Sequence, residues 1–473
     1  MELAKLHEVF VSIVGEDSCI TDSKTIAIHL LDWREKYQGT TPFVLLPSTT
    51  ESVSKIIKFC FDNDIGVVPQ GGNTSLCGAN VPRSTDERME IVISSSKLNR
   101  VIELDADNQS LIVESGCILA RIQETAYENG LYFPLSLGAE GSSQIGGNIS
   151  TNAGGTNVLK YGMTRGLVMG LEVVLPDGSI YSELKGLRKD NTGYDLKQFF
   201  IGAEGTLGFI TKICLKLFLQ PLSHTVALVA VENPKQAIKL LKKAKQSFDE
   251  SLCAFELMNS VSIKCVEDQM PNFKIPLESS YPWQILIDVE NVNSTSESNE
   301  AITSFLERQL KEALILDATI AINNQQRNEF WQLRHGITES KKLSSTGIDH
   351  DISVPISNIP EVIEQSRNKL EQVLGKSDFY VYGHVGDGNL HITKSKPKTM
   401  DKVSFQMKED ELTRIVHQIA VDLGGSFSGE HGIGVKLKNE LEYFSDPVKM
   451  QLLKTIKKAI DPRNIMNPNK LFD

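Results

Sequence analysis

The chain has 473 residues, of which 40% are hydrophobic and 23% are charged, and its formal net charge is -11. These are ordinary globular values that indicate neither disorder nor a membrane class, and the length predicts two or three domains. The negative charge argues against a nucleic-acid partner, because phosphate-binding surfaces need clustered Lys and Arg.

The cysteines and the N-terminal stretch bear on the compartment. Seven cysteines are present and none forms a Cys-x-x-Cys pair, which disfavours a disulfide framework and favours a reducing compartment. The opening MELAKLHEVFVSIVGEDSC resembles neither a secretory signal nor a transit peptide. No apolar run approaches the ~20 residues that a spanning helix needs. We therefore predict a cytoplasmic protein, with peripheral attachment to a membrane left open.

The first 222 residues are rich in Gly and in short β-type runs, which predicts an α+β domain whose loops bind a ligand. Along the chain, strands are predicted at 44–46, 66–68, 91–93, 111–113 and 171–175, and helices at 52–63 and 118–129.

Strands and helices alternate from residue 223 to about residue 404. Strands are predicted at 225–231, 253–257, 283–289, 352–355 and 379–382, and helices at 234–248, 298–313, 325–343 and 359–374. Because the helices have polar faces, this pattern predicts a sheet covered on one side. The remainder, 405–473, is predicted to be helical at 407–423 and 446–460.

Three glycine-rich loops interrupt the first domain. They run from Pro69 to Ser75, from Gly138 to Gly155 with six glycines, and from Gly202 to Gly208. Such density costs backbone entropy, so the second loop indicates close approach to a large phosphate-bearing ligand, whereas the first loop alone resembles an ordinary turn. Neither later loop matches Gly-x-Gly-x-x-Gly, and no Gly-Lys-Ser/Thr ending occurs, which disfavours a Rossmann NAD site and a triphosphate loop.

The stretch from Leu187 to Lys197 and the IGAEGTLGFIT that follows resemble the flavin domain of the vanillyl-alcohol-oxidase superfamily. Within it, the D-2-hydroxyglutarate, D-lactate and glycolate dehydrogenase group is most similar, from about Thr41 through EHGIG to NIMNPNKLF. The resemblance implies an α+β fold. It would comprise a two-subdomain flavin-binding domain (1–222), an α/β substrate (cap) domain with an antiparallel sheet (223–404), and a C-terminal helical segment (405–473) that completes the active site and returns to the flavin domain.

The resemblance also implies FAD as the cofactor. Some superfamily members tether the flavin through a His in or near the first loop, and Gln70 to Ser75 contains none, so non-covalent binding is expected. The first loop would cradle the pyrophosphate, and the other two would lie along the isoalloxazine and adenine ends. The implied FAD contacts are Pro69, Gln70, Gly71, Gly72, Asn73, Thr74, Ser75, Pro134, Leu135, Gly141, Ser142, Gly146, Gly147, Asn148, Thr151, Asn152, Gly154, Gly155, Tyr161, Gly162, Glu204, Gly205, Gly208 and Ile210.

Two further loops hold candidate metal ligands. His384 and His391 flank a turn rich in Gly, Asp and Asn, and a strand–turn–strand path would bring both imidazoles to one point. Glu430 and His431 lie in a second Gly-flanked loop. A lone His is usually structural, but two His and a carboxylate suit Zn²⁺ or Mn²⁺ with positions open for substrate. The resemblance implies that His384, His391 and Glu430 bind a divalent metal and that His431 is the general base.

The oxidation of a 2-hydroxy acid explains such a set. The reaction removes a hydroxyl proton and transfers the α-hydrogen as hydride to the flavin N5, and an alcohol is too weak an acid for imidazole alone. A chelated divalent cation lowers the hydroxyl pKa by several units, after which an imidazole accepts the proton. Asp387 and Asn389 would orient the histidines or cap the turn, and the turn is favoured for Asp387.

Arg334 and Thr338 lie four apart on a helical pattern and therefore on one face. An Arg fork matches a carboxylate bidentately, although a solvated Arg paired with Glu329 or Glu339 is the ordinary alternative. The resemblance implies that Arg334 and Thr338 hold the substrate, and we count Asn389 and His431 with them.

Two residues depart from the D-2-hydroxyglutarate pattern. Asp349 stands where a Lys typically binds the distal carboxylate, and Thr393 stands where Asn is usual. An anion near a second carboxylate is repulsive, so D-2-hydroxyglutarate and another 2-hydroxy acid carry equal weight.

The predicted partners are a small 2-hydroxy acid and a separate electron acceptor, either a protein or a quinone, with a homodimer as a further possibility. The alternatives are an oxygen-using flavin oxidase of another alcohol and the flavin subunit of a multi-chain glycolate or lactate oxidase. In the second case any iron–sulfur cluster would lie on a partner, since no cysteine cluster occurs here.

Overall fold

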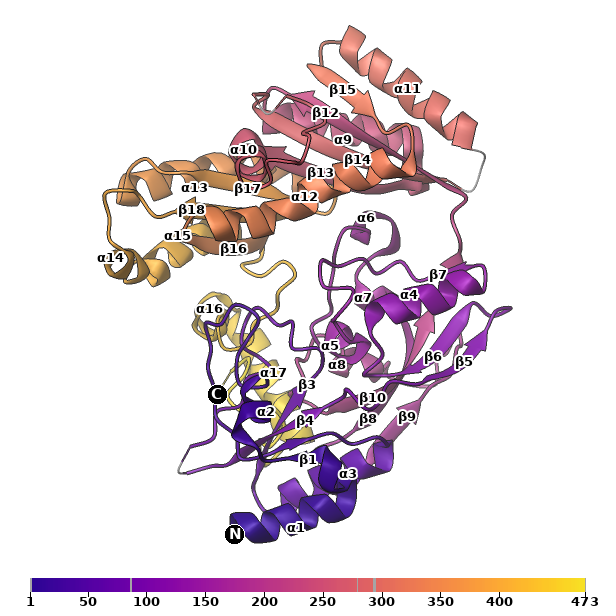
Figure 1. The fold of residues 1–473 in the computed structure, drawn as a ribbon, viewed down its shortest axis with the longest axis vertical. Coiled ribbons are helices and arrows are strands. Elements are labelled where there is room, and N and C mark those ends of the chain that lie inside the picture. Colours follow the sequence, from indigo (N-terminus) through magenta and orange to yellow (C-terminus); the bar gives the residue numbers. More distant parts are fainter. Residues whose placement is uncertain (1, 86, 279, 292–294, 473) are drawn as a thin grey trace. The chain divides into compact units, whose positions relative to one another are not determined.

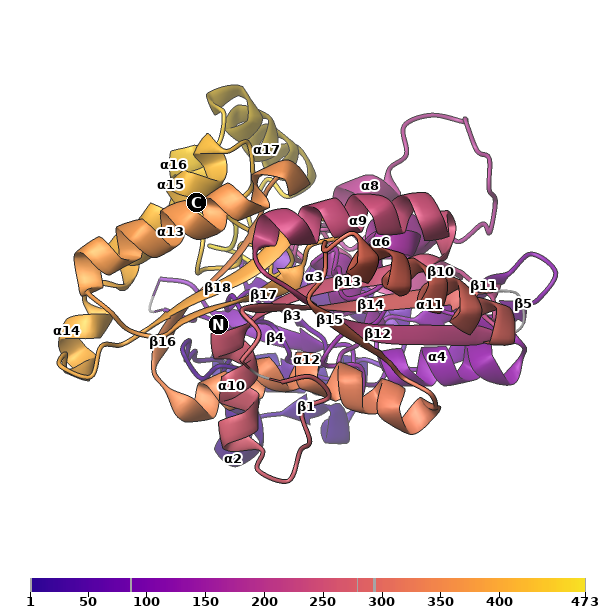
Figure 2. The same ribbon diagram turned by 90° about the horizontal axis from the view of Figure 1, so that it is seen from above.

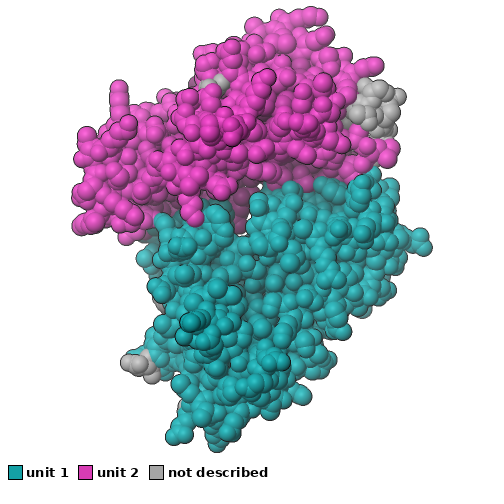
Figure 3. Space-filling view, viewed as in Figure 1, with its two compact units in different colours: residues 1–155, 162–220, 431–473 teal, residues 156–161, 221–430 magenta. Residues whose placement is uncertain are grey.

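The computed structural model describes residues 2–85, 87–278, 280–291 and 295–472. The chain divides into two units (Figure 3), which are described separately below. Unit 1 comprises Met1–Gly155, Gly162–Gln220 and His431–Asp473, and unit 2 comprises Thr156–Tyr161 and Pro221–Glu430. Among the described residues, no helix combines the length and apolarity needed to cross a membrane.

Unit 1 begins with a four-stranded sheet in the order β1-β2-β4-β3, in which β2 and β3 both run parallel to β4. Its strands are nearly all buried, as expected for short apolar runs in a parallel arrangement with α3 as the crossover. The elements are α1 (Leu3–Val14), β1 (Cys19–Ile20), α2 (Ser23–Ala27), β2 (Val44–Leu45), α3 (Thr50–Asp62), β3 (Gly66–Gln70) and β4 (Glu90–Ser94).

A five-stranded antiparallel sheet in the order β5-β6-β10-β8-β9 and the pair β11-β7 complete the strands of unit 1. The elements are β5 (Val101–Asp105), β6 (Ser110–Glu114), α4 (Leu119–Glu128), β7 (Leu131–Tyr132), α5 (Ile145–Ser150), α7 (Thr164–Leu167), β8 (Val168–Val174), β9 (Ile180–Glu183), α8 (Lys197–Phe200), β10 (Phe209–Lys216) and β11 (Phe218–Leu219).

The C-terminal part of unit 1 contains α16 (Lys438–Phe444) and α17 (Pro447–Ile460), drawn in yellow in Figure 1. After α17 the chain pairs with β3: Val67 N donates to Ile465 O at 2.7 Å, and Asn467 N donates to Val67 O at 2.7 Å. Ile465 and Met466 are fully buried in the same core cluster as Val67. The segment that follows α17 therefore contributes Ile465 and Met466 to the core of unit 1.

Unit 2 is built on a seven-stranded antiparallel sheet in the order β15-β12-β14-β13-β17-β18-β16. This is the antiparallel sheet that the resemblance implied. Its elements are α6 (Val158–Tyr161), β12 (Ser223–Val231), α9 (Pro234–Phe248), β13 (Leu252–Asn259), α10 (Ser260–Gln269), β14 (Trp283–Asn291), α11 (Thr295–Lys311), β15 (Asp317–Ile320), α12 (Asn324–Ser344), β16 (Gly347–Ser353), α13 (Ile359–Leu374), β17 (Phe379–His384), β18 (Asn389–Ser395), α14 (Lys402–Gln406) and α15 (Glu409–Asp422).

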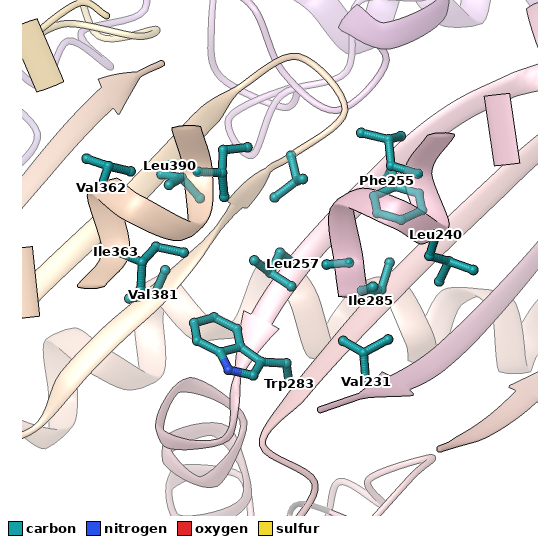
Figure 4. Close-up of a cluster of buried hydrophobic side chains, with 14 of the residues drawn as sticks. Val231, Leu240, Phe255, Leu257, Trp283, Ile285, Val362, Ile363, Val381 and Leu390 are labelled. Carbon is teal, nitrogen blue, oxygen red and sulfur yellow. The ribbon is translucent and has the colours of Figure 1, made fainter. Parts of the chain in front are cut away.

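Helices cover both faces of this sheet, so the prediction of a sheet covered on one side is wrong. Val229 and Val231 of β12 belong to a core shared with α9, α11, α13 and α15, part of which is drawn in Figure 4. Val226 and Leu228 belong to a second core shared with α10 and α12, which lie on the opposite side of the sheet in Figure 2. A consecutive apolar run such as TVALVAV is typical of a strand buried on both faces.

The boundary predicted at residue 404 differs from the observed division. Phe405 and the apolar face of α15 pack into the same core as β17 and β18, so residues up to Glu430 belong to unit 2 and the chain enters unit 1 at His431. The physical reason is the amphipathic face of α15, which covers the sheet.

Candidate active site

The two candidate metal-binding histidines lie near the turn of one β-hairpin in unit 2. His384 ends β17, and His391 lies on β18 opposite Tyr382. The turn is closed by the amides of Asp387 and Gly388, which donate to His384 O at 3.2 and 3.1 Å. Asp387 Oδ1 accepts from the Asn389 amide at 3.1 Å, which is the turn-capping role favoured for it. The predicted strand–turn–strand path thus brings the two imidazoles together.

Glu430 joins the two histidines from the loop that follows α15. Its Oε1 lies 3.3 Å from His384 Nε2, and its Oε2 lies 3.8 Å from His391 Nε2. One potential ligand atom from each of the three residues lies within 4.8 Å of the others. Two imidazoles and one carboxylate at this spacing fit the ligand set of a divalent metal with further positions open.

A carboxylate faces the other nitrogen of each imidazole. Glu256 on β13 pairs with His384 in the sheet, and its Oε1 lies 2.7 Å from His384 Nδ1. Asp351 on β16 pairs with His391, and its Oδ1 lies 3.8 Å from His391 Nδ1. A carboxylate within hydrogen-bond distance of Nδ1, as Glu256 is for His384, fixes the tautomer of a metal-binding histidine and turns Nε2 toward the ion. The arrangement supports metal binding more strongly than the three ligands alone.

The charges of this cluster also favour a cation. Burial alone would lower the pKa of His384, but the Glu256 and Glu430 carboxylates outweigh it and raise the pKa well above the usual value. Burial likewise opposes ionisation of Glu256, yet the charges of His384 and Arg334 lower the pKa of its carboxyl to about 2. Carboxylates held ionised in a buried place need positive partners. Protonated His384 and Arg334 are these partners here, and a divalent ion, which binds the neutral imidazole, would take the place of the His384 proton.

Asp351 links the hairpin to the Glu430 loop. Its Oδ2 accepts from the Glu430 amide at 2.8 Å, and its Oδ1 accepts from Asn389 Nδ2 at 2.8 Å. Asn389 is buried, and within the described part of the chain no donor reaches its Oδ1. The amide nitrogen of Asn389, a predicted substrate contact, therefore binds the framework of the candidate site, and its Oδ1 is a buried acceptor without a donor among the described residues.

Arg334 and Thr338 project from α12 onto the same region of unit 2. Arg334 is buried, and its Nε donates to Glu256 Oε2 at 2.7 Å. That bond uses one of the five N–H donors of a guanidinium. Thr338 Oγ1 lies 3.2 Å from the hydroxyl of Tyr382, whose ring centroid is 5.1 Å from that of His391. The pairing of Arg334 with Glu329 or Glu339, the ordinary alternative, is replaced by a buried pairing with Glu256.

Unit 1 brings the three glycine loops into contact with one another. A Cβ on Gly72 would lie 1.9 Å from Ser142 O, and one on Gly205 would lie 2.8 Å from Pro69 Cγ. The first loop therefore packs closely on the second and on the third, and side chains at these two positions would separate them.

Two adjacent residues of α5 show that this region fits a ligand. A Cβ on Gly147 would meet nothing within 4 Å among the described residues, so packing does not explain the glycine. Asn148 is buried, yet within the same described ranges its Oδ1 has no hydrogen-bond partner. A glycine without a packing role beside a buried acceptor is what the close approach of a polar cofactor such as FAD requires.

The remaining predicted FAD contacts in unit 1 lie around these loops. One group lies near the second loop and α5: Pro134, Leu135, Gly141, Ser142, Gly146, Thr151, Asn152, Gly154, Gly155 and Gly162. A second group lies at the end of β3: Gln70, Gly71, Asn73, Thr74 and Ser75. The last two residues, Gly208 and Ile210, lie at β10. Some side chains serve the fold itself: Gln70 Nε2 donates to His29 O and Asn80 O, both at 3.0 Å. Tyr161 lies in unit 2, where its hydroxyl donates to Glu290.

Glu204 holds the chain that carries His431. Its buried carboxylate accepts from the amides of Ile433 at 2.7 Å and Gly434 at 2.8 Å. Gly432 has φ +77 and passes so close that a Cβ there would lie 2.7 Å from Glu204 Oε1. The side chain of Glu204, predicted to contact FAD, therefore anchors the segment that follows the candidate base.

This contact predicts a pH-dependent stability. Burial raises the pKa of the Glu204 carboxyl from 4.5 to about 7, against the two amide donors that lower it. Between these values the folded state binds more protons than the unfolded state, so the free energy of unfolding falls as pH rises through this window, by roughly 3 kcal/mol. In urea unfolding of flavin-free protein at pH 4.5 and pH 8, Glu204→Gln should remove that part of the pH dependence. The exposed-site control Glu128→Gln should retain it, and an unchanged pH dependence in Glu204→Gln would contradict the assignment.

Comparisons with known proteins identify the family of the chain. A family model described as "FAD linked oxidases, C-terminal domain" matches residues 220–471, and one described as "FAD binding domain" matches residues 41–182. The "Probable D-2-hydroxyglutarate dehydrogenase, mitochondrial" of Oryza sativa subsp. indica is 37% identical over 467 residues, covering 98% of this chain and 81% of the relative. The "D-2-hydroxyglutarate dehydrogenase, mitochondrial" of Danio rerio is 36% identical over 456 residues, covering 95% of this chain and 82% of the relative.

Solved structures support the same fold. A substrate-bound p-cresol methylhydroxylase matches with a TM-score of 0.76 at 15% identity, covering 99% of this chain and 97% of that one. An alkyldihydroxyacetonephosphate synthase matches with a TM-score of 0.75 at 15% identity, covering 99% of this chain and 85% of that one. These likenesses confirm the predicted α+β fold of the vanillyl-alcohol-oxidase type. The family models and the sequence relatives together show that the chain belongs to the FAD-linked oxidase family, among the FAD-linked 2-hydroxy-acid dehydrogenases.

Proposed function

We propose that this chain oxidises a D-2-hydroxy acid to the 2-oxo acid in a metal-assisted reaction and passes the electrons to a separate acceptor, a protein or a quinone. The observation that carries the proposal is the cluster of His384, His391 and Glu430, in which the Nδ1 atoms of the two imidazoles face Glu256 and Asp351. The names of the sequence relatives, D-2-hydroxyglutarate dehydrogenases, support the substrate class.

Each residue of the site has a distinct part in this proposal. His384, His391 and Glu430 would hold the metal, which when bound supplies a positive charge that lowers the pKa of a chelating hydroxyl. The loops of unit 1 would hold FAD without a covalent bond, and FAD when bound supplies the hydride acceptor. Arg334 would bind the substrate carboxylate with its remaining N–H donors, and Thr338 and Asn389 would add hydrogen bonds.

His431 would accept the hydroxyl proton on its imidazole. It directly follows the ligand Glu430, so the Cα atoms of the two residues are about 3.8 Å apart. The base is thus tied by one peptide bond to a metal ligand. Glu204 fixes the backbone just beyond it through Ile433 and Gly434, which limits the positions that the imidazole can take.

A panel of D- and L-2-hydroxy acids with an artificial dye as acceptor tests the proposal. D-2-hydroxy acids should reduce the dye, and the matching L-enantiomers should not. Stoichiometric hydrogen peroxide under air would instead identify an oxygen-using oxidase, and failure of the single purified chain with every acid would support dependence on partner chains.

The cytoplasmic location and the homodimer stay predictions; the relatives named above are mitochondrial by name.

A further inference from the structure

A second polar cluster lies one turn further along α12 from the candidate substrate residues. Lys341 follows Arg334 and Thr338 at positions i, i+4 and i+7, which places the three on one helix face. Asp349 on β16 and Thr393 on β18 are direct partners in the sheet. Asp349 and Thr393 are the two residues that depart from the D-2-hydroxyglutarate pattern, and the structure places both against Lys341.

The Lys341 ammonium is enclosed by oxygen atoms. Its Nζ lies 2.7 Å from Asp349 Oδ1, 2.7 Å from Thr393 Oγ1 and 3.4 Å from the Tyr382 hydroxyl. Thr393 Oγ1 in turn donates to Asp349 Oδ1 at 2.7 Å. An ammonium has three N–H donors, so each donor has an acceptor here. Of the ion pair, the Lys341 side chain is 8% exposed and the Asp349 side chain is 28% exposed.

Tyr382 joins this cluster to the candidate active site. Its ring centroid lies 5.4 Å from Lys341 Nζ and 5.1 Å from the ring centroid of His391. The guanidinium carbon of Arg334 lies 5.0 Å from the same centroid. Lys341, Arg334 and His391 therefore surround one ring, and the cluster borders the site on the side where Thr338 contacts Tyr382.

We propose that Lys341, Asp349 and Thr393 determine substrate choice, favouring 2-hydroxy acids with an uncharged far end over those with a second carboxylate. This inference rests on the function proposed above. A second carboxylate that reached the cluster would first meet Asp349, the more exposed partner, and like charges repel. To bind Lys341 it would have to displace Asp349 and break a largely buried ion pair. A methyl, ethyl or hydroxyl end meets neither obstacle.

Substrate ratios measure this effect directly. With purified holoprotein and a dye acceptor, kcat/KM for D-2-hydroxybutyrate should exceed that for D-2-hydroxyglutarate by about tenfold or more. Asp349→Asn keeps the shape, removes the competing charge and leaves the ammonium to a substrate carboxylate. It should lower that ratio by about tenfold or more, mainly through the KM for D-2-hydroxyglutarate. The matched control Glu339→Gln, which removes the same charge from an exposed position on α12, should leave the ratio unchanged.

Two outcomes would overturn the inference: a wild-type preference for D-2-hydroxyglutarate, or an Asp349→Asn variant with the wild-type ratio. If no 2-hydroxy acid is oxidised, the proposed function fails, and calorimetric binding of 2-oxobutyrate and 2-oxoglutarate to the holoprotein tests the cluster separately. Wild-type protein should bind 2-oxobutyrate more tightly, and Asp349→Asn should reduce the difference. Equal affinities in the wild-type protein would contradict the inference even if the variant did not fold.

Discussion

Removal of the divalent metal is expected to lower turnover of a D-2-hydroxy acid by about 10³-fold or more. The physical reason is the loss of the charge that stabilises the developing alkoxide, a contribution of several kcal/mol at about 1.4 kcal/mol per tenfold in rate. Dialysis of the holoprotein against a chelator, followed by assay with and without added Zn²⁺ or Mn²⁺, checks this. Activity should vanish on chelation and return with one of the two ions, while the flavin stays bound.

A ligand substitution separates this effect from general damage by the chelator. His391→Ala removes one of the three donors and should abolish both metal content and turnover, with the flavin retained because the glycine loops belong to unit 1. The control is His7→Ala on α1, which replaces the same side chain in unit 1, outside the candidate site. Full activity in chelated, metal-free protein would refute the metal role.

Substitution of His431 by Ala is expected to lower kcat by about 10²- to 10⁴-fold, the usual contribution of a positioned general base. Flavin and metal content should remain at wild-type levels, because Glu204 holds the following segment through the backbone amides of Ile433 and Gly434. Absorbance, metal analysis and steady-state kinetics together test the variant.

Added imidazole should restore part of the activity of His431→Ala, since it supplies the missing proton acceptor in solution. The matched comparison is His391→Ala, in which imidazole should restore no turnover unless metal binding is also restored. A His431→Ala variant that keeps more than about a tenth of the wild-type kcat would exclude His431 as the general base.

The secondary structure of unit 2 was predicted best where one element has one strong period. The amphipathic helices at 234–248 and 359–374 were predicted with the bounds observed for α9 and α13. Strand 352–355 was misplaced, because β16 is Gly347–Ser353 and carries Asp349, His350 and Asp351. Three polar residues in succession do not show the alternation that predicts a strand. The pairing of this strand with β18 is set by tertiary contacts, which local β-propensity does not reveal. Helix α10 was missed for a similar reason, since its Ser, Lys, Glu and Asp residues give only a weak pattern.

The candidate metal ligands His384, His391 and Glu430 could be found from the sequence because they lie in conspicuous Gly-flanked loops, whereas the carboxylates that face the two imidazoles could not. Glu256 comes from β13, more than a hundred residues before His384, and Asp351 from β16. The one available signal for Glu256 was a single acid inside the otherwise apolar run LCAFELM, since a buried charge requires a partner. The sequence also did not indicate that Lys341 neutralises Asp349, because a contact between a helix and a strand produces no periodic pattern of residues in the sequence.

The most direct test of the central claim is anaerobic mixing of the purified, metal-loaded holoprotein with D- and L-2-hydroxy acids while the flavin absorbance is followed. The expected result is bleaching of the oxidised flavin band by at least one D-2-hydroxy acid, with formation of the corresponding 2-oxo acid and no bleaching by its L-enantiomer. A flavin that stays oxidised with every D-2-hydroxy acid, in protein shown to contain both flavin and metal, would contradict the proposed function.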